Sequence, residues 1–113
     1  MITKGQDNCL YVYPHADFER LAAQLHSTPA TDKSVRSFSR MLFASASAEV
    51  PDRQGRITVP ASLREYARLS RDCKVVGANN RLEIWDAAAW DRYEAENTPA
   101  FADQAEEVLP GVL

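Results

Sequence analysis

The chain has 113 residues, of which 45% are apolar and 26% are charged, and its formal net charge is −3. This length supports one compact domain or two small halves that share a core, and the composition excludes disordered and fibrous classes. No apolar run approaches the roughly 20 residues of a membrane span, and no apolar signal region follows Met1, so we expect neither membrane insertion nor secretion.

Apolar spacing and turn residues predict a hairpin and two helices in the first half of the chain. Residues 1–4 and 9–13 are expected to form strands around a polar turn. A helix is predicted at 15–26, because Pro14 suits a helix start and apolar residues recur there with helical spacing. Thr31 or Asp32 then caps a second helix. The apolar stripe of that second helix is Val35, Phe38, Met41 and Leu42.

The second half is predicted to repeat a hairpin-and-helix pattern twice. In order, we expect strands at 46–50 and 56–59 around a tight turn at 52–55, a helix at 61–69, strands at 74–77 and 81–85, and a helix at 87–96. After Pro99 the acidic tail shows no clear period, so weak order is expected there. The aromatic residues expected in the core are Tyr13, Phe18, Trp85 and Trp90.

Two segments of the chain resemble each other at an offset of 72 residues. Residues 5–23 match residues 77–95 at six of nineteen ungapped positions, and this alignment superposes Gly5 on Gly77. Residues 52–60, just before the second segment, have no counterpart, because the equivalent stretch would precede Met1. The chain is therefore expected to contain two repeats, the first of which lacks its opening third.

The most motif-like stretch runs from Asp52 to Pro60. Asp52 can accept backbone N–H bonds across the turn, and Gly55 permits a backbone conformation that a side chain would penalise. Arg56 would then occupy a defined place on a rigid hairpin, where its guanidinium can meet a phosphate or a guanine edge. Pro60 is expected to close the returning strand, because it cannot donate a hydrogen bond to a sheet.

Charge is unevenly distributed around this motif. Residues 52–74 carry a local charge of +3, and residues 86–113 carry −6. Arg53 lies on the turn beside Arg56, and Arg64 and Arg68 lie four residues apart, on one face of the predicted helix at 61–69. The alternatives are an internal salt bridge from Arg56 to Asp52 or Glu65, and a merely solvated helix face for the other cations.

The run from Asp52 to Arg64, with its Asp-x-x-Gly-Arg-Ile-Thr-Val-Pro core, resembles the AbrB-like (SpoVT-AbrB) swapped-hairpin module. Two such modules about 70 residues apart are similar to the MraZ family of bacterial transcriptional regulators. This resemblance covers residues 1 to about 95. It implies an α+β fold in which swapped hairpins form a β-barrel, with the first repeat incomplete here.

The family resemblance also implies a function. Such regulators are cytoplasmic, associate with the nucleoid, assemble into rings, and bind direct repeats of double-stranded DNA in the promoter ahead of a division and cell-wall gene cluster. Their DNA contact centres on Asp-x-x-x-Arg in each repeat, which only Asp52 and Arg56 match here. The predicted DNA-binding residues are Arg53, Arg56, Arg64 and Arg68, and those that shape the motif are Asp52, Gly55 and Pro60.

These patterns divide the chain into four predicted parts. Residues 1–26 are a remnant of the first repeat, 27–45 a connecting helix, 46–96 a complete second repeat, and 97–113 an acidic tail. A start codon assigned downstream of the true one would explain the missing segment. Restoring that segment is expected to raise stability or solubility, because a two-stranded hairpin is marginal alone.

No enzyme class fits the sequence. It has no Gly-x-Ser-x-Gly elbow and no glycine-rich phosphate loop, and no histidine is placed to serve Cys9 or Cys73. The two cysteines are isolated and the two histidines, His15 and His26, read as surface residues, so no metal and no cofactor are expected. The alternative to a DNA-binding regulator is an interaction-only subunit that modulates full-length rings without binding DNA.

Overall fold

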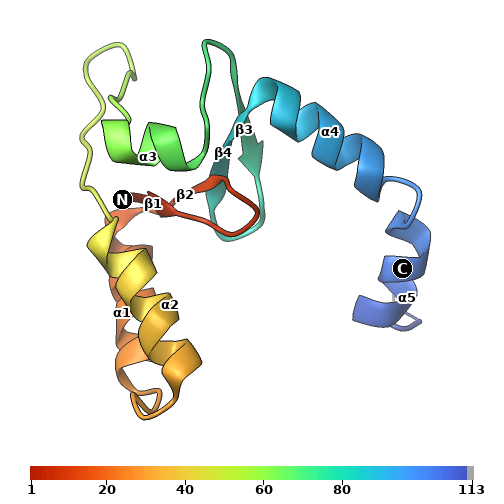
Figure 1. Cartoon of the computed structure of the whole chain (residues 1–113), viewed down its shortest axis with the longest axis horizontal. Coiled ribbons are helices and arrows are strands. Elements are labelled where there is room, and N and C mark those ends of the chain that lie inside the picture. The colour runs from red at the N-terminus through yellow and green to blue at the C-terminus, as the bar shows by residue number, and fades with distance from the viewer. Residues whose placement is uncertain (112–113) are drawn as a thin grey trace.

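The structure is a computed structural model that describes residues 1–111, and it confirms the predicted α+β class. Its elements in chain order are β1 (Ile2–Lys4), β2 (Leu10–Val12), α1 (His15–His26), α2 (Lys33–Ala44), α3 (Ala61–Tyr66), β3 (Cys73–Gly77), β4 (Leu82–Asp86), α4 (Ala87–Asn97) and α5 (Phe101–Val108). The strands form one antiparallel sheet in the order β1-β2-β4-β3, and the helices lie around it (Figure 1).

The two hairpins join at β2 and β4, the strands that correspond in the internal alignment. The register pairs Leu10 with Ile84, Tyr11 with Glu83, and Val12 with Leu82. A 72-residue offset exchanges Tyr11 with Glu83, and it maps the pair Leu10–Ile84 onto the pair Leu82–Val12. The register therefore creates a local two-fold axis between Tyr11 and Glu83.

The two hairpin loops differ in length by one residue. The first is closed by Gly5 N–H donating to the Cys9 carbonyl (2.8 Å), and the second by Ala78 N–H donating to the Arg81 carbonyl (2.9 Å). Three residues lie between Gly5 and Cys9, whereas two lie between Ala78 and Arg81. Gly5 thus corresponds in position to Ala78, and the ungapped superposition of Gly5 on Gly77 is wrong.

The hydrophobic core lies on the sheet face that α3 covers. Leu63 of α3 is completely buried against Ile2 and Leu10. The two-fold axis maps these two sheet residues onto Val75 and Leu82, which are 60% and 47% exposed. One half of this face is therefore covered, and its symmetry-related half is open.

Helices α2 and α4 meet the sheet through polar and aromatic contacts. The Thr3 hydroxyl donates to the Leu42 carbonyl of α2 (2.5 Å). Trp85 of β4 contacts Trp90 of α4, with ring centroids 5.3 Å apart. Phe18 and Trp85 are buried as predicted, whereas Tyr13 and Trp90 are only partly buried.

Most predicted helices and hairpins form at or near their expected bounds. Helix α1 has the predicted bounds, and Asp32 caps α2 by accepting the N–H of Ser34 (2.8 Å). The turn before β4 contains Asn79 with a φ of 63°, as its sequence indicates. Asp86 caps α4, where its carboxylate accepts the N–H of Ala89 (3.3 Å).

Two predictions about regular structure are wrong. Residues 46–50 and 56–59 do not form strands; their one contact with the sheet's backbone in the described part of the chain is a bridge between Ser47 and Ile2. A strand needs a partner backbone, and β propensity alone does not supply one. The tail expected to be weakly ordered instead contains helix α5, whose apolar residues recur with helical spacing.

The open half of the sheet face leads to a stability prediction. Leu10→Ala should lower the free energy of unfolding by about 2–5 kcal/mol, because it leaves a cavity in the covered half. The matched change Leu82→Ala should cost less than about 1 kcal/mol, because this side chain is already half exposed. Urea denaturation of both variants measures the difference. Equal losses would contradict the asymmetry of the core.

Candidate nucleic-acid interface

The Asp52–Arg56 turn lies in the segment that connects α2 to α3 and projects from the body of the chain (Figure 1). Asp52 N–H donates to the Arg56 carbonyl (2.9 Å), and Gly55 N–H donates to the Asp52 carbonyl (3.0 Å). Gly55 has a φ of +76°, and a Cβ built there would meet no atom within 4 Å. Glycine is therefore favoured here by backbone conformation alone, as the sequence predicts for a tight turn.

The Asp52 carboxylate organises the turn. Its Oδ1 accepts the backbone N–H groups of Gln54 and Arg56, each at 2.9 Å, and its Oδ2 accepts Nε–H of Arg56 at 2.9 Å. The Arg56 backbone and side-chain hydrogen bonds hold the pKa of the Asp52 carboxyl below its ordinary value. Asp52 is thus charged at neutral pH and fixes both the backbone and the base of the guanidinium.

The Arg56 side chain is 73% exposed although it pairs with Asp52. The internal salt bridge foreseen as an alternative exists, and its partner is Asp52 rather than Glu65. Within residues 1–111, Arg56 uses Nε alone for side-chain hydrogen bonds, which leaves both terminal nitrogens for another acceptor. The ion pair and a DNA contact are therefore compatible.

The other predicted cations occupy different positions. Arg53 lies exposed on the turn itself. Arg64 lies on α3, and its Nη1 donates to the Val59 carbonyl (2.6 Å), so this side chain anchors the end of the segment that follows the turn. Pro60 precedes α3 as its N-cap, and its carbonyl accepts the N–H of Arg64 (3.0 Å). No spacing rule in the sequence predicts the anchoring bond of Arg64.

Arg68 is not on the same helix face as Arg64, contrary to the prediction. Helix α3 ends at Tyr66, three residues before the predicted end. Arg68 has a φ of +51°, its N–H donates to the Glu65 carbonyl, and the next N–H, of Leu69, donates to the Arg64 carbonyl. This pair of bonds is a Schellman motif, in which the left-handed position is usually glycine.

Tertiary packing explains the early end of α3. Leu69, the residue after the left-handed position, packs against the core cluster that contains Leu63. The chain must reverse at Arg68 to bring Leu69 back to that cluster. The arginine side chain is consequently exposed at a position where the backbone conformation is unfavourable for it.

The structure places the acidic helix α5 away from the Asp52–Arg56 turn and α3, whereas α4 begins beside the end of the basic stretch, where Ala87 N–H donates to the Asp72 carbonyl (3.0 Å). Figure 1 shows the Asp52–Arg56 turn and α3 on one side of the sheet and α5 on the other side of the molecule. Screening at cellular salt confines electrostatic fields to about 8–10 Å. The net charge of −3 therefore does not cancel the local charge of +3 on residues 52–74.

Residues 1–111 show neither a metal-binding cluster nor a membrane-spanning helix. No cluster of three or more His, Cys, Asp or Glu side chains is arranged to hold a metal ion. No helix has both the length and the apolar character needed to cross a membrane.

The hydrogen bonds within the turn lead to a prediction about the titration of the Asp52 carboxyl. The pKa of Asp52 is lowered, so its contribution to the turn is present above its ordinary pKa and is lost as pH falls through the folded-state pKa. A carboxyl carbon NMR titration should find Asp52 titrating below an ordinary aspartate. Arg56→Ala should move its pKa upward, because the side-chain bond is removed. An unchanged Asp52 titration in this variant would contradict the geometry.

Comparison with known proteins places the chain. It matches the sequence model of a family described as "MraZ protein, putative antitoxin-like" in two parts, residues 1–41 and 42–110. Proteins named "Transcriptional regulator MraZ" are 62% identical in Thermobifida fusca, 57% in Frankia casuarinae and 56% in a Parafrankia strain, each over 113 residues. These alignments cover 100% of the chain and 79% of each relative. The chain belongs to the MraZ family.

Proposed function

We propose that this chain is a transcription regulator that binds double-stranded DNA through the Asp52–Arg56 turn. The relatives named above are transcriptional regulators, which are not an enzyme class. The observation that carries the proposal is the turn itself, where a carboxylate fixes Nε of an arginine that remains 73% exposed. A pre-oriented guanidinium loses less conformational freedom when it binds.

Each cation has a role in this proposal. The terminal nitrogens of Arg56 match the O6 and N7 acceptors that guanine presents in the major groove. Arg53 contacts a phosphate beside the same groove, and Arg64 and Arg68 contact the DNA backbone farther along. Gly55 shapes the Asp52–Arg56 turn, Pro60 shapes the start of α3, and neither contacts DNA itself.

Arg68 supports the proposal through its unfavourable backbone. Glycine would suit the left-handed position better, and an exposed arginine there has no side-chain hydrogen bond within the described residues. Residues in sparsely populated conformations often serve function rather than stability. A phosphate contact explains why a long cation occupies this position.

One turn offers few contacts, so useful affinity requires several copies on repeated sites. We propose a homo-oligomer, in the form of a ring, that binds direct repeats in the promoter ahead of a division and cell-wall gene cluster. This function places the protein in the cytoplasm, in association with the nucleoid. The organisation proposed for the chain is an incomplete first repeat (1–26), a connecting helix (27–45), a second repeat (46–96) and an acidic tail (97–113).

The central test uses Arg56→Ala and a duplex that covers the promoter upstream of the chain's own gene. Affinity should fall by about 1–3 kcal/mol per contact, because a bidentate base contact is lost. The matched control is Arg92→Ala, which removes one positive charge from α4, away from the turn. Fluorescence polarisation measures both variants at fixed salt. Equal losses would show a nonspecific charge effect, and a folded wild-type chain that binds no DNA would favour the interaction-only subunit.

Arg68→Gly separates stability from binding. The free energy of unfolding should rise by up to about 1 kcal/mol, because glycine relieves the left-handed strain. DNA binding should weaken for all sequences. The slope of log K against log salt concentration should become shallower by about one, because one phosphate contact is lost. Urea melts and polarisation at several salt concentrations give both quantities. A more stable variant with unchanged DNA affinity would remove Arg68 from the interface.

A further inference from the structure

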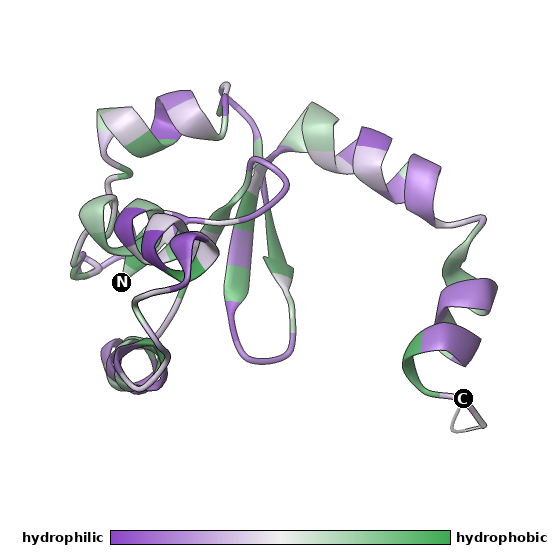
Figure 2. Cartoon of the chain, turned by 60° about the horizontal axis from the view of Figure 1, so that its bottom comes forward, coloured by the Kyte–Doolittle hydropathy of each residue, from purple (hydrophilic) through white to green (hydrophobic). Residues whose placement is uncertain are grey.

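Helix α5 has an apolar stripe with no packing partner in the described part of the chain. Phe101, Val108 and Leu109 are 67%, 73% and 45% exposed, and no residue of the helix is buried. These residues recur with helical spacing along one side, and Figure 2 shows hydrophobic segments at both ends of α5. An isolated helix shorter than about 12 residues is marginal in water, so α5 needs a surface on which to pack.

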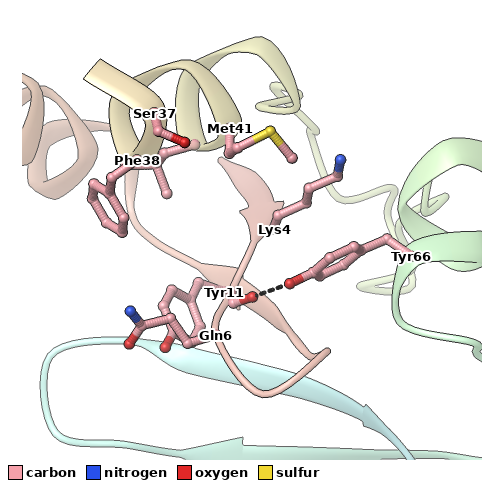
Figure 3. A pocket seen from close by; sticks show the side chains of 9 residues that line it. Lys4, Gln6, Tyr11, Ser37, Phe38, Met41 and Tyr66 are labelled. Carbon is pink, nitrogen blue, oxygen red and sulfur yellow. Dashed lines mark hydrogen bonds between the residues drawn. The ribbon is translucent and has the colours of Figure 1, made fainter. Parts of the chain in front are cut away.

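A second apolar surface, also without a packing partner among residues 1–111, lies between α2 and the β1–β2 turn. Phe38 and Met41 of α2 are 42% and 52% exposed there, at the mouth of a groove of about 230 Å³ (Figure 3). Tyr66 closes one side of the groove, where its hydroxyl donates to the Gly5 carbonyl (2.5 Å). The groove is below the roughly 300 Å³ of small-molecule sites, and its size suits a protein side chain.

The two surfaces are both apolar, and the parts of the chain that carry them differ in net charge. The charged residue that lines the groove is Lys4, and no carboxylate is among its lining residues. Helix α5 carries Asp103, Glu106 and Glu107 and no cation, with its acids on the side opposite the stripe. More broadly, residues 86–113 carry −6 and the rest of the chain carries +3, which favours approach of one copy's tail to another copy's body.

The arrangement of the chain favours a contact between copies. Helices α2 and α5 lie at different ends of the molecule, on either side of the sheet (Figure 1). A surface at one end that fits a surface at the other creates a head-to-tail contact, which generates rings when the rotation closes. The open sheet face at Val75 and Leu82 is a different surface, related by the local two-fold axis to the one that α3 covers.

We propose that α5 of one copy docks into the α2 groove of a second copy, with Phe101 placed between Phe38 and Met41. Methionine adapts its shape to an inserted aromatic ring, and sulfur–aromatic contacts are favourable. This docking rests on the proposed function, because it provides the contact that assembles the regulator on repeated sites. The docking gives the acidic tail, residues 97–113, a structural role in assembly.

The test compares the full chain with Phe101→Asp and Met41→Asp by sedimentation velocity. The wild type should assemble, and each variant should associate at least about tenfold more weakly, since a central apolar anchor is lost. Both residues are exposed, so thermal melts should stay close to the wild type; Phe101→Ala and Met41→Ala should weaken assembly in the same direction. Glu107→Ala, on the opposite side of α5, is the matched control and should assemble like the wild type.

Mixing the two aspartate variants tests the head-to-tail geometry. Each variant keeps one intact surface, so an equimolar mixture should form 1:1 dimers that grow no further. A monomeric wild-type chain, as expected if α5 packs on its own groove, would overturn the proposal. Variants that assemble like the wild type would also overturn it.

DNA binding separates a failure of this proposal from a failure of the proposed function. Both aspartate variants should bind a duplex with one promoter repeat as tightly as the wild type, because the Asp52–Arg56 turn is untouched. Neither variant should bind a duplex with tandem repeats more tightly than a duplex with a single repeat, because avidity requires assembly. Loss of assembly with no DNA binding by any form would support the docking and reject the DNA-binding role. Tandem-site avidity that persists in both variants would reject the docking alone.

Discussion

The pairing of β2 with β4 is the constraint on which the rest of the structure depends. Tyr11 and Glu83 face each other at its centre, and Glu83 is 9% exposed. Arg81 connects the two residues, since its guanidinium lies 4.0 Å from the Tyr11 ring centroid and donates to Glu83 at 2.8 and 3.0 Å. Trp85 Nε1–H donates to the other carboxylate oxygen at 3.1 Å. A slip of one residue would turn every side chain to the wrong face and break this buried network.

The position of the candidate interface follows from that register. Pairing of the hairpins builds the face on which Leu63 of α3 packs, and α3 in turn fixes the end of the 46–60 segment. The bridge from Ser47 to Ile2 fixes its beginning. The Asp52–Arg56 turn is thereby held at both ends while its tip stays clear of the sheet. A stable core and an exposed, organised arginine are consequences of the same arrangement.

Local signals predict much of this fold and long-range partners decide the rest. The caps at Asp32 and Asp86 and the turn at Asn79 are encoded by neighbouring residues, and each forms as expected. The strands expected at 46–50 and 56–59 do not form, because in the described residues their backbone pairing with the sheet is limited to the single bridge between Ser47 and Ile2. The early end of α3 is set by the packing of Leu69, which helical periodicity cannot show.

The candidate site was predictable to a similar degree. The internal bonds of the motif follow from Asp and Gly at fixed spacing, so Asp52 and Gly55 have the expected roles in the turn. The left-handed backbone of Arg68 and the bond from Arg64 to Val59 were not predictable, because both depend on how α3 meets the core. Spacing along the chain identified the cations, and tertiary packing determined the direction in which each is held.

Native-state hydrogen exchange tests the central role of the β2–β4 pairing most directly. The amides that bond across these two strands should be the slowest in the chain and should exchange only on global unfolding, because the core and the buried Glu83 network both rest on them. The amides of the 52–56 turn and of α5 should exchange much faster through local opening. Exchange across β2 and β4 as fast as that of α5 would contradict the account.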